Sequence, residues 1–177
     1  FTSGSTGAPK GVCLSAVGLM ETASAVARRL AALPIDRHLA VLPLSLLLEN
    51  TAGIYAPLLR GAEILVPDLP TLGWHGMSGF DPAALQRAVA TAAPSSLILV
   101  PELLKLWALF LAASGQEGAA SLCYVAVGGA RVSPALLSEA RALGLPAYQG
   151  YGLTECGSVV SINRPGENHG PRFAGLP

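Results

Sequence analysis

The chain has 177 residues, a length that suits one domain. Eleven basic residues balance eleven acidic ones, only 12% of the residues are charged, and 51% are hydrophobic. This composition excludes a disordered tail and argues against a nucleic-acid-binding protein, which would carry a basic excess. Such an apolar chain without an initiator methionine is expected to be an internal fragment of a longer protein, with apolar surface meant for missing neighbours.

No segment is apolar over the about 20 residues that a membrane-spanning helix requires. The longest suitable run, residues 39–48, is interrupted by Pro43 and followed by Glu49. The three cysteines form no CxxC pair, which argues against a zinc site or a disulfide framework. We therefore expect a protein without a transmembrane helix, located in the reducing cytoplasm.

Helix and strand patterns alternate along the chain. Ser15 is a typical N-cap and Pro34 a typical stop, which predicts a first helix that ends near Leu33. The Pro- and Gly-rich residues 67–80 are expected to be a loop. The other expected helices are 50–59, 81–92, 102–113 and 133–143, and the expected strands are 38–44, 62–66, 96–100, 122–127, 146–149 and 156–162. This alternation predicts an α/β fold with a largely parallel sheet flanked by helices.

The strongest local signal is the segment TSGSTGAPKG, residues 2–11. Its glycines let backbone N–H groups approach an anion, its hydroxyls add donors, and Lys10 supplies a mobile positive charge. The spacing is not that of a Walker A loop, because Pro9 precedes the lysine and Gly11 follows it. A Ser/Gly linker is the alternative, but a linker does not need one of only two lysines beside a proline. The segment predicts a site for a phosphate-rich ligand.

Two further glycine motifs follow later in the chain. In GYGLTE, residues 150–155, Tyr151 could lie against a flat base, and Glu155 could help hold Mg²⁺ on phosphate oxygens. A Gly-rich turn with an exposed glutamate is the alternative for this motif. The segment VGGA, residues 127–130, follows a predicted strand and is a weak signal by itself, because strand-to-helix glycine turns are common.

Taken together, these three segments resemble the adenylate-forming superfamily of acyl-CoA synthetases, firefly-type luciferases and adenylation domains of peptide synthetases. FTSGSTGAPKGV resembles its phosphate loop, GGARVSP resembles its GGAPLSP segment, and QGYGLTE matches its YG-x-TE motif. The order and separation of the motifs also agree with the family. The resemblance spans the whole chain, because the final FAGLP is similar to the family's GSVGRP segment.

The resemblance implies ATP-dependent activation of a carboxylic acid to an acyl-adenylate, followed by thioester formation with CoA as co-substrate. It implies ATP and Mg²⁺ as cofactors, with Lys10, Thr154 and Glu155 as catalytic residues and Glu155 as the metal ligand. The residues that it assigns to ATP are Thr2, Ser3, Gly4, Ser5, Thr6, Gly7 and Lys10 at the β,γ-phosphates, Gly128, Gly129 and Ala130 at the adenine and acyl pocket, Tyr151 and Gly152 beside adenine, and Thr154 at the α-phosphate.

The segment LPLSLLLENTAGIYAPLLRGAEI resembles a stretch of long-chain fatty acyl-CoA synthetases, which implies a fatty acid as substrate. The family's His and Arg in that stretch are Leu46 and Asn50 here. These departures favour one alternative, a non-catalytic ATP-binding homologue or interaction module. A second alternative is transfer of the acyl group to a carrier-protein thiol. Peripheral membrane contact is compatible with a fatty-acid enzyme, although no basic amphipathic helix supports it.

The resemblance also indicates what the 177 residues lack. The family carries a ribose-binding Asp and a catalytic Lys further along the chain, the Lys in a small C-terminal lid domain. We therefore expect this chain to be a fragment of an AMP-binding domain and to be inactive alone. Among the remaining residues, Trp107 is expected in the core, Cys156 is expected to be buried, and His38 is expected to be structural or exposed. Glu49 is either a first-turn acid or a functional residue.

Overall fold

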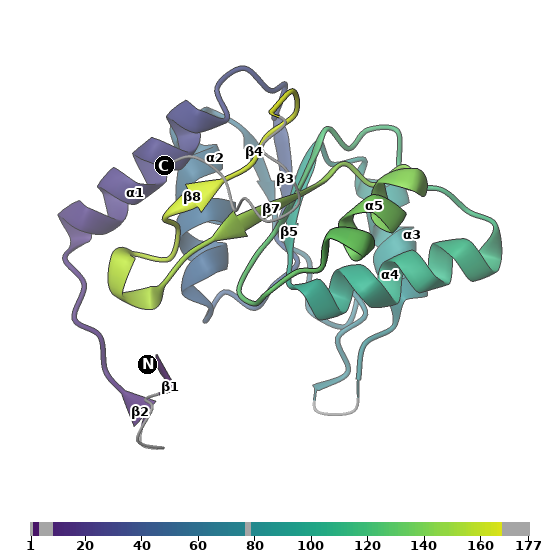
Figure 1. Ribbon diagram of the computed structural model, residues 1–177, viewed down its shortest axis with the longest axis horizontal. Coiled ribbons are helices and arrows are strands. Elements are labelled where there is room, and N and C mark those ends of the chain that lie inside the picture. The colour runs from purple at the N-terminus through teal and green to yellow at the C-terminus, as the bar shows by residue number, and fades with distance from the viewer. Residues whose placement is uncertain (1, 4–8, 77–78, 168–177) are drawn as a thin grey trace.

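The computed structural model of the chain describes residues 2–3, 9–76 and 79–167, with side chains described from residue 10 onward (Figure 1). The main sheet has six strands in the order β4-β3-β5-β6-β7-β8. Their bounds are β3 Arg37–Leu39, β4 Glu63–Leu65, β5 Ser96–Leu99, β6 Tyr124–Val127, β7 Ala147–Tyr151 and β8 Ser161–Ile162. All neighbours are parallel except β7 and β8, which confirms the predicted α/β fold with a largely parallel sheet.

Helices cover both faces of this sheet (Figure 1). One layer contains α1 (Ala16–Arg29), the π-helical segment η1 (Glu49–Tyr55) and α2 (Ala56–Leu59), which pack against one another. The other layer contains α3 (Pro82–Ala92), α4 (Pro101–Ser114) and α5 (Pro134–Ala142). Within the described ranges, no helix is long and apolar enough to cross a bilayer.

Three helices begin at the residues that the sequence predicts. The hydroxyl of Ser15 accepts the N–H of Gly18 at 3.0 Å, and the carboxylate of Asp81 accepts the N–H of Ala83 at 2.9 Å. Ser133 accepts the N–H of Leu136 in the same way. Each side chain satisfies a backbone donor that has no partner within the helix, which is why these residue types mark helix starts.

The predicted helix 50–59 is the π-helical segment η1 followed by α2, and three other predicted elements end or begin elsewhere than expected. The first helix ends at Arg29, and Arg60 donates to the carbonyl of Leu33 at 2.6 Å where the chain turns. The predicted strand 38–44 stops at Leu39, because the N–H of Leu42 donates to the carboxylate of Glu49 and Pro43 has no N–H. Of the predicted strand 156–162, only its last two residues pair with β7.

The segment before β8 is the 3₁₀ turn η3 (Thr154–Cys156) followed by a loop. The N–H of Gly157 donates to the carbonyl of Thr154 at 3.1 Å and closes the turn. The prediction that Cys156 is buried is wrong, because this turn exposes it. Backbone hydrogen bonds within the turn therefore override the apolar pattern of the segment.

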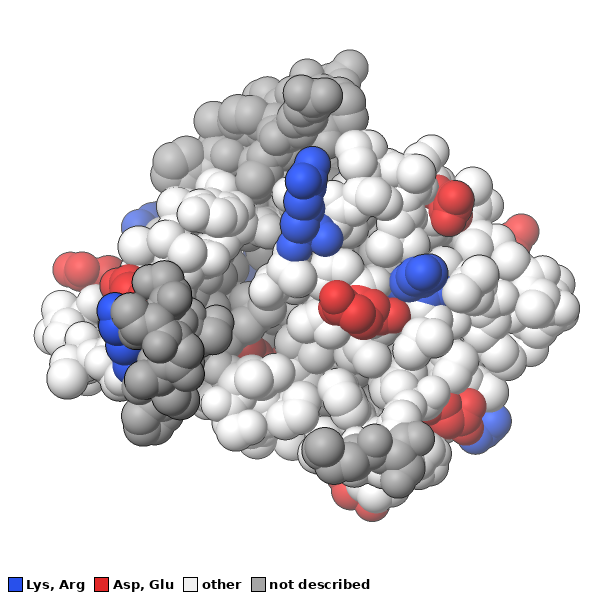
Figure 2. Space-filling view, turned by 60° about the horizontal axis from the view of Figure 1, so that its bottom comes forward, with Lys and Arg blue, Asp and Glu red and all other residues white. Residues whose placement is uncertain are grey.

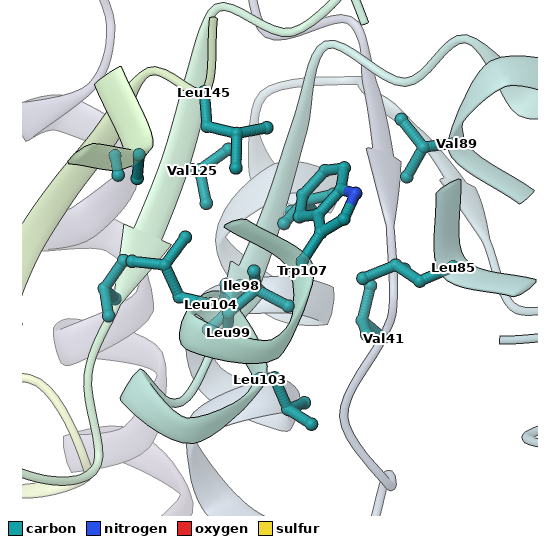
Figure 3. Close-up of a cluster of buried hydrophobic side chains, with 14 of the residues drawn as sticks. Val41, Leu85, Val89, Ile98, Leu99, Leu103, Leu104, Trp107, Val125 and Leu145 are labelled. Carbon is teal, nitrogen blue, oxygen red and sulfur yellow. The ribbon is translucent and has the colours of Figure 1, made fainter. Parts of the chain in front are cut away.

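Large apolar side chains fill the space between the sheet and the layer of α3, α4 and α5 (Figure 3). Trp107 on α4 is fully buried and donates its indole N–H to the side-chain oxygen of Gln86 at 2.8 Å, which confirms its predicted place in the core. The strand residues on this face include Leu39, Leu97, Leu99, Val125 and Val127, all at most 1% exposed. Burial of such side chains is the main favourable contribution to folding.

Candidate active site

The opposite face of the sheet, under α1, η1 and α2, carries small and polar side chains beside larger ones and encloses a cavity. Successive side chains of a strand point to opposite faces, so Tyr124, Ala126 and then Gly128 line the cavity along β6. The free space inside is about 60 Å³, and most of its wall is apolar. The residues that line it include Gly128 and Gly129 of the VGGA motif and Gly150, Tyr151 and Gly152 of the GYGLTE motif.

The two glycine motifs meet because β6 and β7 are parallel neighbours, with Val127 opposite Gln149. The carboxyl ends of parallel strands emerge at the same edge, which is where α/β proteins bind ligands. A Cβ atom at Gly128 would lie 3.7 Å from the carbonyl oxygen of Gly150. Ala130 is exposed and lies beyond the residues that line the cavity. The structure thus brings together two of the three motifs that the sequence singles out.

Tyr151, the last residue of β7, lines the cavity at the end that we call its mouth, and Thr154 and Glu155 follow in the next turn of the chain. A Cβ atom at Gly152 would lie 1.5 Å from the carbonyl oxygen of Ser158, so only glycine lets these two backbone segments approach so closely. The N–H of Ser158 donates to the carbonyl of Leu153 at 3.0 Å and closes the loop. Tyr151 is 48% exposed, which leaves part of its ring available to a ligand.

The carboxylate of Glu155 is exposed and forms no ion pair with another described residue. Within the described part of the chain, no group of three or more His, Cys, Asp or Glu side chains is placed to hold a metal ion by itself. Mg²⁺ is commonly bound by one or two carboxylates together with the phosphates of a substrate. The single free carboxylate of Glu155 fits that mode of binding.

The first motif begins and ends in a two-stranded hairpin apart from the main sheet (Figure 1). Strand β1 (Thr2–Ser3) pairs antiparallel with β2 (Pro9–Lys10), with Thr2 opposite Lys10. Lys10 is exposed and does not line the cavity. Gly4, Ser5, Thr6 and Gly7, and the side chains of Thr2 and Ser3, lie outside the described residues. The structure therefore describes only the two ends of the motif. That the motif approaches the cavity stays a prediction.

A buried polar network borders the cavity, and the sequence alone does not predict that its residues meet. His38 on β3 lies 2.9 Å from the hydroxyl of Ser96 on β5 through Nδ1, and 3.4 Å from Oε1 of Glu49 through Nε2. The second carboxylate oxygen, Oε2, accepts the N–H of Leu42 at 3.1 Å. All three side chains are at most 3% exposed. The available signal was a charged residue, Glu49, directly after an apolar run.

Two departures from the family pattern lie on the surface beside this network. Leu46 is 44% exposed, and the side-chain amide of Asn50 donates to the carbonyls of Leu44 and Leu46. Asn50 thus satisfies backbone groups where the chain enters the η1 helix. Neither side chain takes part in the buried contacts between Glu49 and His38.

Tyr124 forms the wall of the cavity next to Ser96. Its ring stacks on that of Tyr148 with the centroids 5.4 Å apart, and its hydroxyl donates to the carbonyl of Asn163 at 2.8 Å. Burial and the neighbouring Tyr148 raise the pKa of Tyr124 above its ordinary value. The hydroxyl therefore stays a neutral donor and joins β6 to the chain that follows β8.

Charged side chains are sparse around the lower side of the molecule. Figure 2, turned so that this side comes forward, shows Lys, Arg, Asp and Glu side chains scattered among uncharged residues, some of them beside a side chain of opposite charge. The described residues on this face form neither a cluster of basic side chains nor a cluster of acidic ones. A nucleic-acid-binding surface would need a positive patch or stripe.

Comparisons with known proteins agree with this architecture. The AMP-binding enzyme family matches residues 1–177. An acyl-CoA synthetase of Alternaria alternata is 28% identical over 174 residues, which cover 95% of this chain and 28% of that protein. Cyclosporin synthetase of Tolypocladium inflatum is 33% identical over 173 residues, which cover 95% of this chain and 1% of that protein. The chain thus spans less than a third of either relative.

Among solved structures, O-succinylbenzoate coenzyme A synthetase of Bacillus subtilis in complex with AMP has the same fold, with a TM-score of 0.77 and 24% identity. The similarity covers 99% of this chain and 34% of that one. The same enzyme in complex with ATP and a magnesium ion gives the same TM-score of 0.77. With three ordered motifs, this fold and a family match from end to end, the chain belongs to the AMP-binding family of adenylate-forming enzymes.

Proposed function

We propose that the protein carrying this chain uses ATP to activate a carboxylic acid, forming an acyl-adenylate and pyrophosphate, and then transfers the acyl group to CoA. One observation supports this most directly. The VGGA and GYGLTE motifs meet at the mouth of a mostly apolar cavity, and the Glu155 carboxylate in the turn that follows Gly152 has no ion-pair partner among the described residues. Nucleotide, metal and acid would then meet at one edge of the sheet.

Each residue at the mouth has a chemical role in this proposal. Gly128 and Gly129, with Ala130 after them, would border adenine, and Tyr151 beside Gly152 would pack against its ring. The hydroxyl of Thr154 would donate to the α-phosphate, where the acid attacks. Mg²⁺ held by Glu155 would neutralise phosphate charge. Negative charge accumulates on the phosphate oxygens in the transition state, so donors and a cation held in place lower the barrier.

The first motif would bind the phosphates that leave as pyrophosphate. Lys10 is exposed at one end of the hairpin, so its ammonium is available to an anion. The hydroxyls of Thr2, Ser3, Ser5 and Thr6 and the backbone N–H groups of Gly4 and Gly7 would complete this set of donors. The proposal therefore requires the hairpin to approach the cavity mouth when ATP binds.

The wall of the cavity favours an acid with an apolar body, and we propose a fatty acid. The acyl-CoA synthetase of Alternaria alternata supports CoA as the acceptor. The 33% identity to cyclosporin synthetase favours a second candidate, in which the acyl group passes to a carrier-protein thiol. Leu46 and Asn50, which stand where the family has His and Arg, favour a third candidate, a non-catalytic ATP-binding homologue or interaction module. We expect a cytoplasmic protein.

The test is ATP–pyrophosphate exchange by the full-length protein with Mg²⁺ and fatty acids of graded length, followed by thioester formation with CoA. We expect Lys10→Ala and Glu155→Gln each to reduce exchange by about 10²-fold, the scale seen when one charge-stabilising group is removed. Lys105→Ala and Glu139→Gln, two exposed residues on α4 and α5, are matched controls and should leave exchange unchanged. Binding of ATP without exchange for any acid would favour the non-catalytic homologue.

A further inference from the structure

The cavity has a polar floor at the end away from the glycine motifs. His38, Ser96 and Tyr124 are direct neighbours across β3, β5 and β6, near the amino ends of these strands. Gly128 lies four residues beyond Tyr124, which is about 13 Å along an extended chain. Arg60 also lines the cavity, and it donates to the carbonyls of Leu30 and Leu33. One mostly apolar cavity thus has both the glycine motifs and a buried hydroxyl in its lining.

Contacts from two layers hold this hydroxyl in place. Ser96 bonds Nδ1 of His38, and the other ring nitrogen faces Glu49. Glu49 folds back over the wide turn of η1, because a Cβ atom at Gly53 would lie 2.2 Å from its Oε1. The backbone N–H of Leu42 holds the second carboxylate oxygen. The imidazole therefore has a partner on each nitrogen and a single orientation.

The direction of these hydrogen bonds decides what Ser96 offers to the cavity. A carboxylate only accepts, so Glu49 requires a proton on Nε2 of His38. We assign to His38 the tautomer with its proton on Nε2, so that Nδ1 accepts from the Ser96 hydroxyl 2.9 Å away. The lone pairs of the Ser96 oxygen receive no donor from the described residues. Ser96 therefore presents an acceptor at the floor of a mostly apolar cavity.

We propose that Ser96 is a specificity-determining residue that binds a hydroxyl group at the far end of the acid's apolar body. This inference rests on the proposed function, and it narrows the substrate class from plain fatty acids to acids with a terminal hydroxyl. A neutral donor fits better than an ammonium group, because the positively charged residue Arg60 also lines the cavity. A plain alkyl end would leave the Ser96 lone pairs without a partner.

His38 and Glu49 are positioning residues in this proposal, because they set the direction of the Ser96 hydroxyl. In Glu49→Gln, the amide oxygen keeps the N–H of Leu42, so the NH₂ group faces His38 and donates to Nε2. The proton of the imidazole then moves to Nδ1 and is donated to Ser96, which frees the Ser96 O–H to donate into the cavity. The preference should shift from acids with a terminal hydroxyl to acids with a terminal ketone, a change that a purely structural role would not produce.

The experiment measures ATP–pyrophosphate exchange by the full-length protein with pairs of straight-chain acids of equal length, one saturated and one with a terminal hydroxyl. At one chain length we expect kcat/KM to favour the hydroxy acid about tenfold, the ratio that one net hydrogen bond supplies. Ser96→Ala should abolish this preference, and Ser96→Thr, which keeps the hydroxyl, should retain it. Ser138→Ala on the exposed side of α5 is the control and should change nothing.

The two levels of the proposal fail in different ways. No exchange with any acid would overturn the proposed function and this inference with it. Exchange with saturated acids at every length, without a hydroxyl preference and unaffected by Ser96→Ala, would overturn this inference alone. A preference for acids with a second carboxylate at the far end would also overturn this inference, because it would show that Arg60 and not Ser96 binds that end. If Ser96→Ala does not fold, Ser96→Thr and Glu49→Gln still test the preference.

Discussion

The two faces of the central sheet differ in what they bury. Toward α3, α4 and α5, the strands present Leu and Val side chains that form one buried cluster with Trp107 (Figure 3). Toward α1, η1 and α2, the same strands present His38, Ser96, Ala126 and Gly150, which line a cavity. Because neighbouring residues of a strand point to opposite faces, one short apolar segment supplies both a packed core and a binding wall.

Because of this difference, one face should mainly determine the stability of the molecule and the other face what it binds. The filled face should supply most of the free energy of folding, because the burial of large apolar side chains dominates that free energy. The face with the cavity gives up packing and keeps buried polar groups, which contribute little net stability but do determine what binds. Substitutions on the two faces should therefore affect different measurements.

The largest effect is expected on the filled face. Trp107→Ala should lower the free energy of unfolding by about 3 to 5 kcal/mol, because it leaves a cavity in a close-packed region and Gln86 without its partner. Leu109→Ala on the same helix, where the side chain is 57% exposed, is the matched control and should change stability little. Urea unfolding of the full-length protein measures both. Equal effects of the two changes would show that this face is not the packed one.

The next effect tests how the polar network is built. Gly53→Ala should lower the free energy of unfolding by about 3 kcal/mol, because the new methyl group would overlap the carboxylate of Glu49. The loss should shrink markedly when Gly53→Ala is made in a Glu49→Ala background, since the carboxylate is then gone. A double-mutant cycle from urea unfolding gives this coupling. Additive losses would mean that Gly53 is required for another reason.

A smaller effect compares one substitution on the two faces. Ala147→Val adds bulk to a fully buried position on the filled face and should lower the free energy of unfolding by about 1 to 2 kcal/mol. Ala126→Val adds the same groups to the cavity wall, where space exists, and should change stability by less. It should instead lower kcat/KM for the longer acids. A larger loss of stability in Ala126→Val than in Ala147→Val would contradict this comparison.

The sequence predicts the local elements and motifs of this molecule well where one short-range interaction decides the structure. Ser15, Asp81 and Ser133 accept backbone N–H groups within the next turn, so their helix starts are readable from neighbouring residues. The meeting of the VGGA and GYGLTE motifs follows from the order of parallel strands and from the family resemblance. The role of each site residue stays a prediction.

The parts that the sequence does not predict depend on contacts between distant residues. The network needs β3 beside β5, the π-helical turn at Glu49 and the lack of a side chain at Gly53, and no periodic pattern encodes all three. The same network ends the predicted strand 38–44 early, because Leu42 donates to Glu49 instead of to a neighbouring strand. Exposure of Cys156 likewise follows from the backbone hydrogen bonds of its turn, which a hydrophobicity pattern does not show.

The smallest expected effect concerns the ion pair that joins α1, in the layer over the cavity, to the chain after β8. The carboxylate of Glu167, in the chain after β8, accepts hydrogen bonds from Arg29 of α1 at 2.6 Å and from Arg164 at 2.9 Å. Burial raises the pKa of this carboxyl, but the hydrogen bonds and charges of the two arginines outweigh it, so the pKa lies below its ordinary value. The filled face is held by apolar packing instead, so only the α1 side should respond to pH through this group.

A carboxyl whose pKa is lowered by folding stabilises the protein above its unfolded pKa of about 4.3, and this contribution is lost as the pH falls through the folded value. At about pH 7, Glu167→Gln should therefore lower the free energy of unfolding by up to about 1 kcal/mol, and the difference from the wild type should shrink toward zero below about pH 4. Glu63→Gln breaks the exposed pair with Arg37 and should have a smaller effect at either pH. Urea unfolding of the wild type and both variants, at about pH 7 and below about pH 4, measures these differences in the free energy of unfolding. A Glu167→Gln difference that persists in acid would assign its effect to packing, and the two faces would then be held by the same kind of interaction.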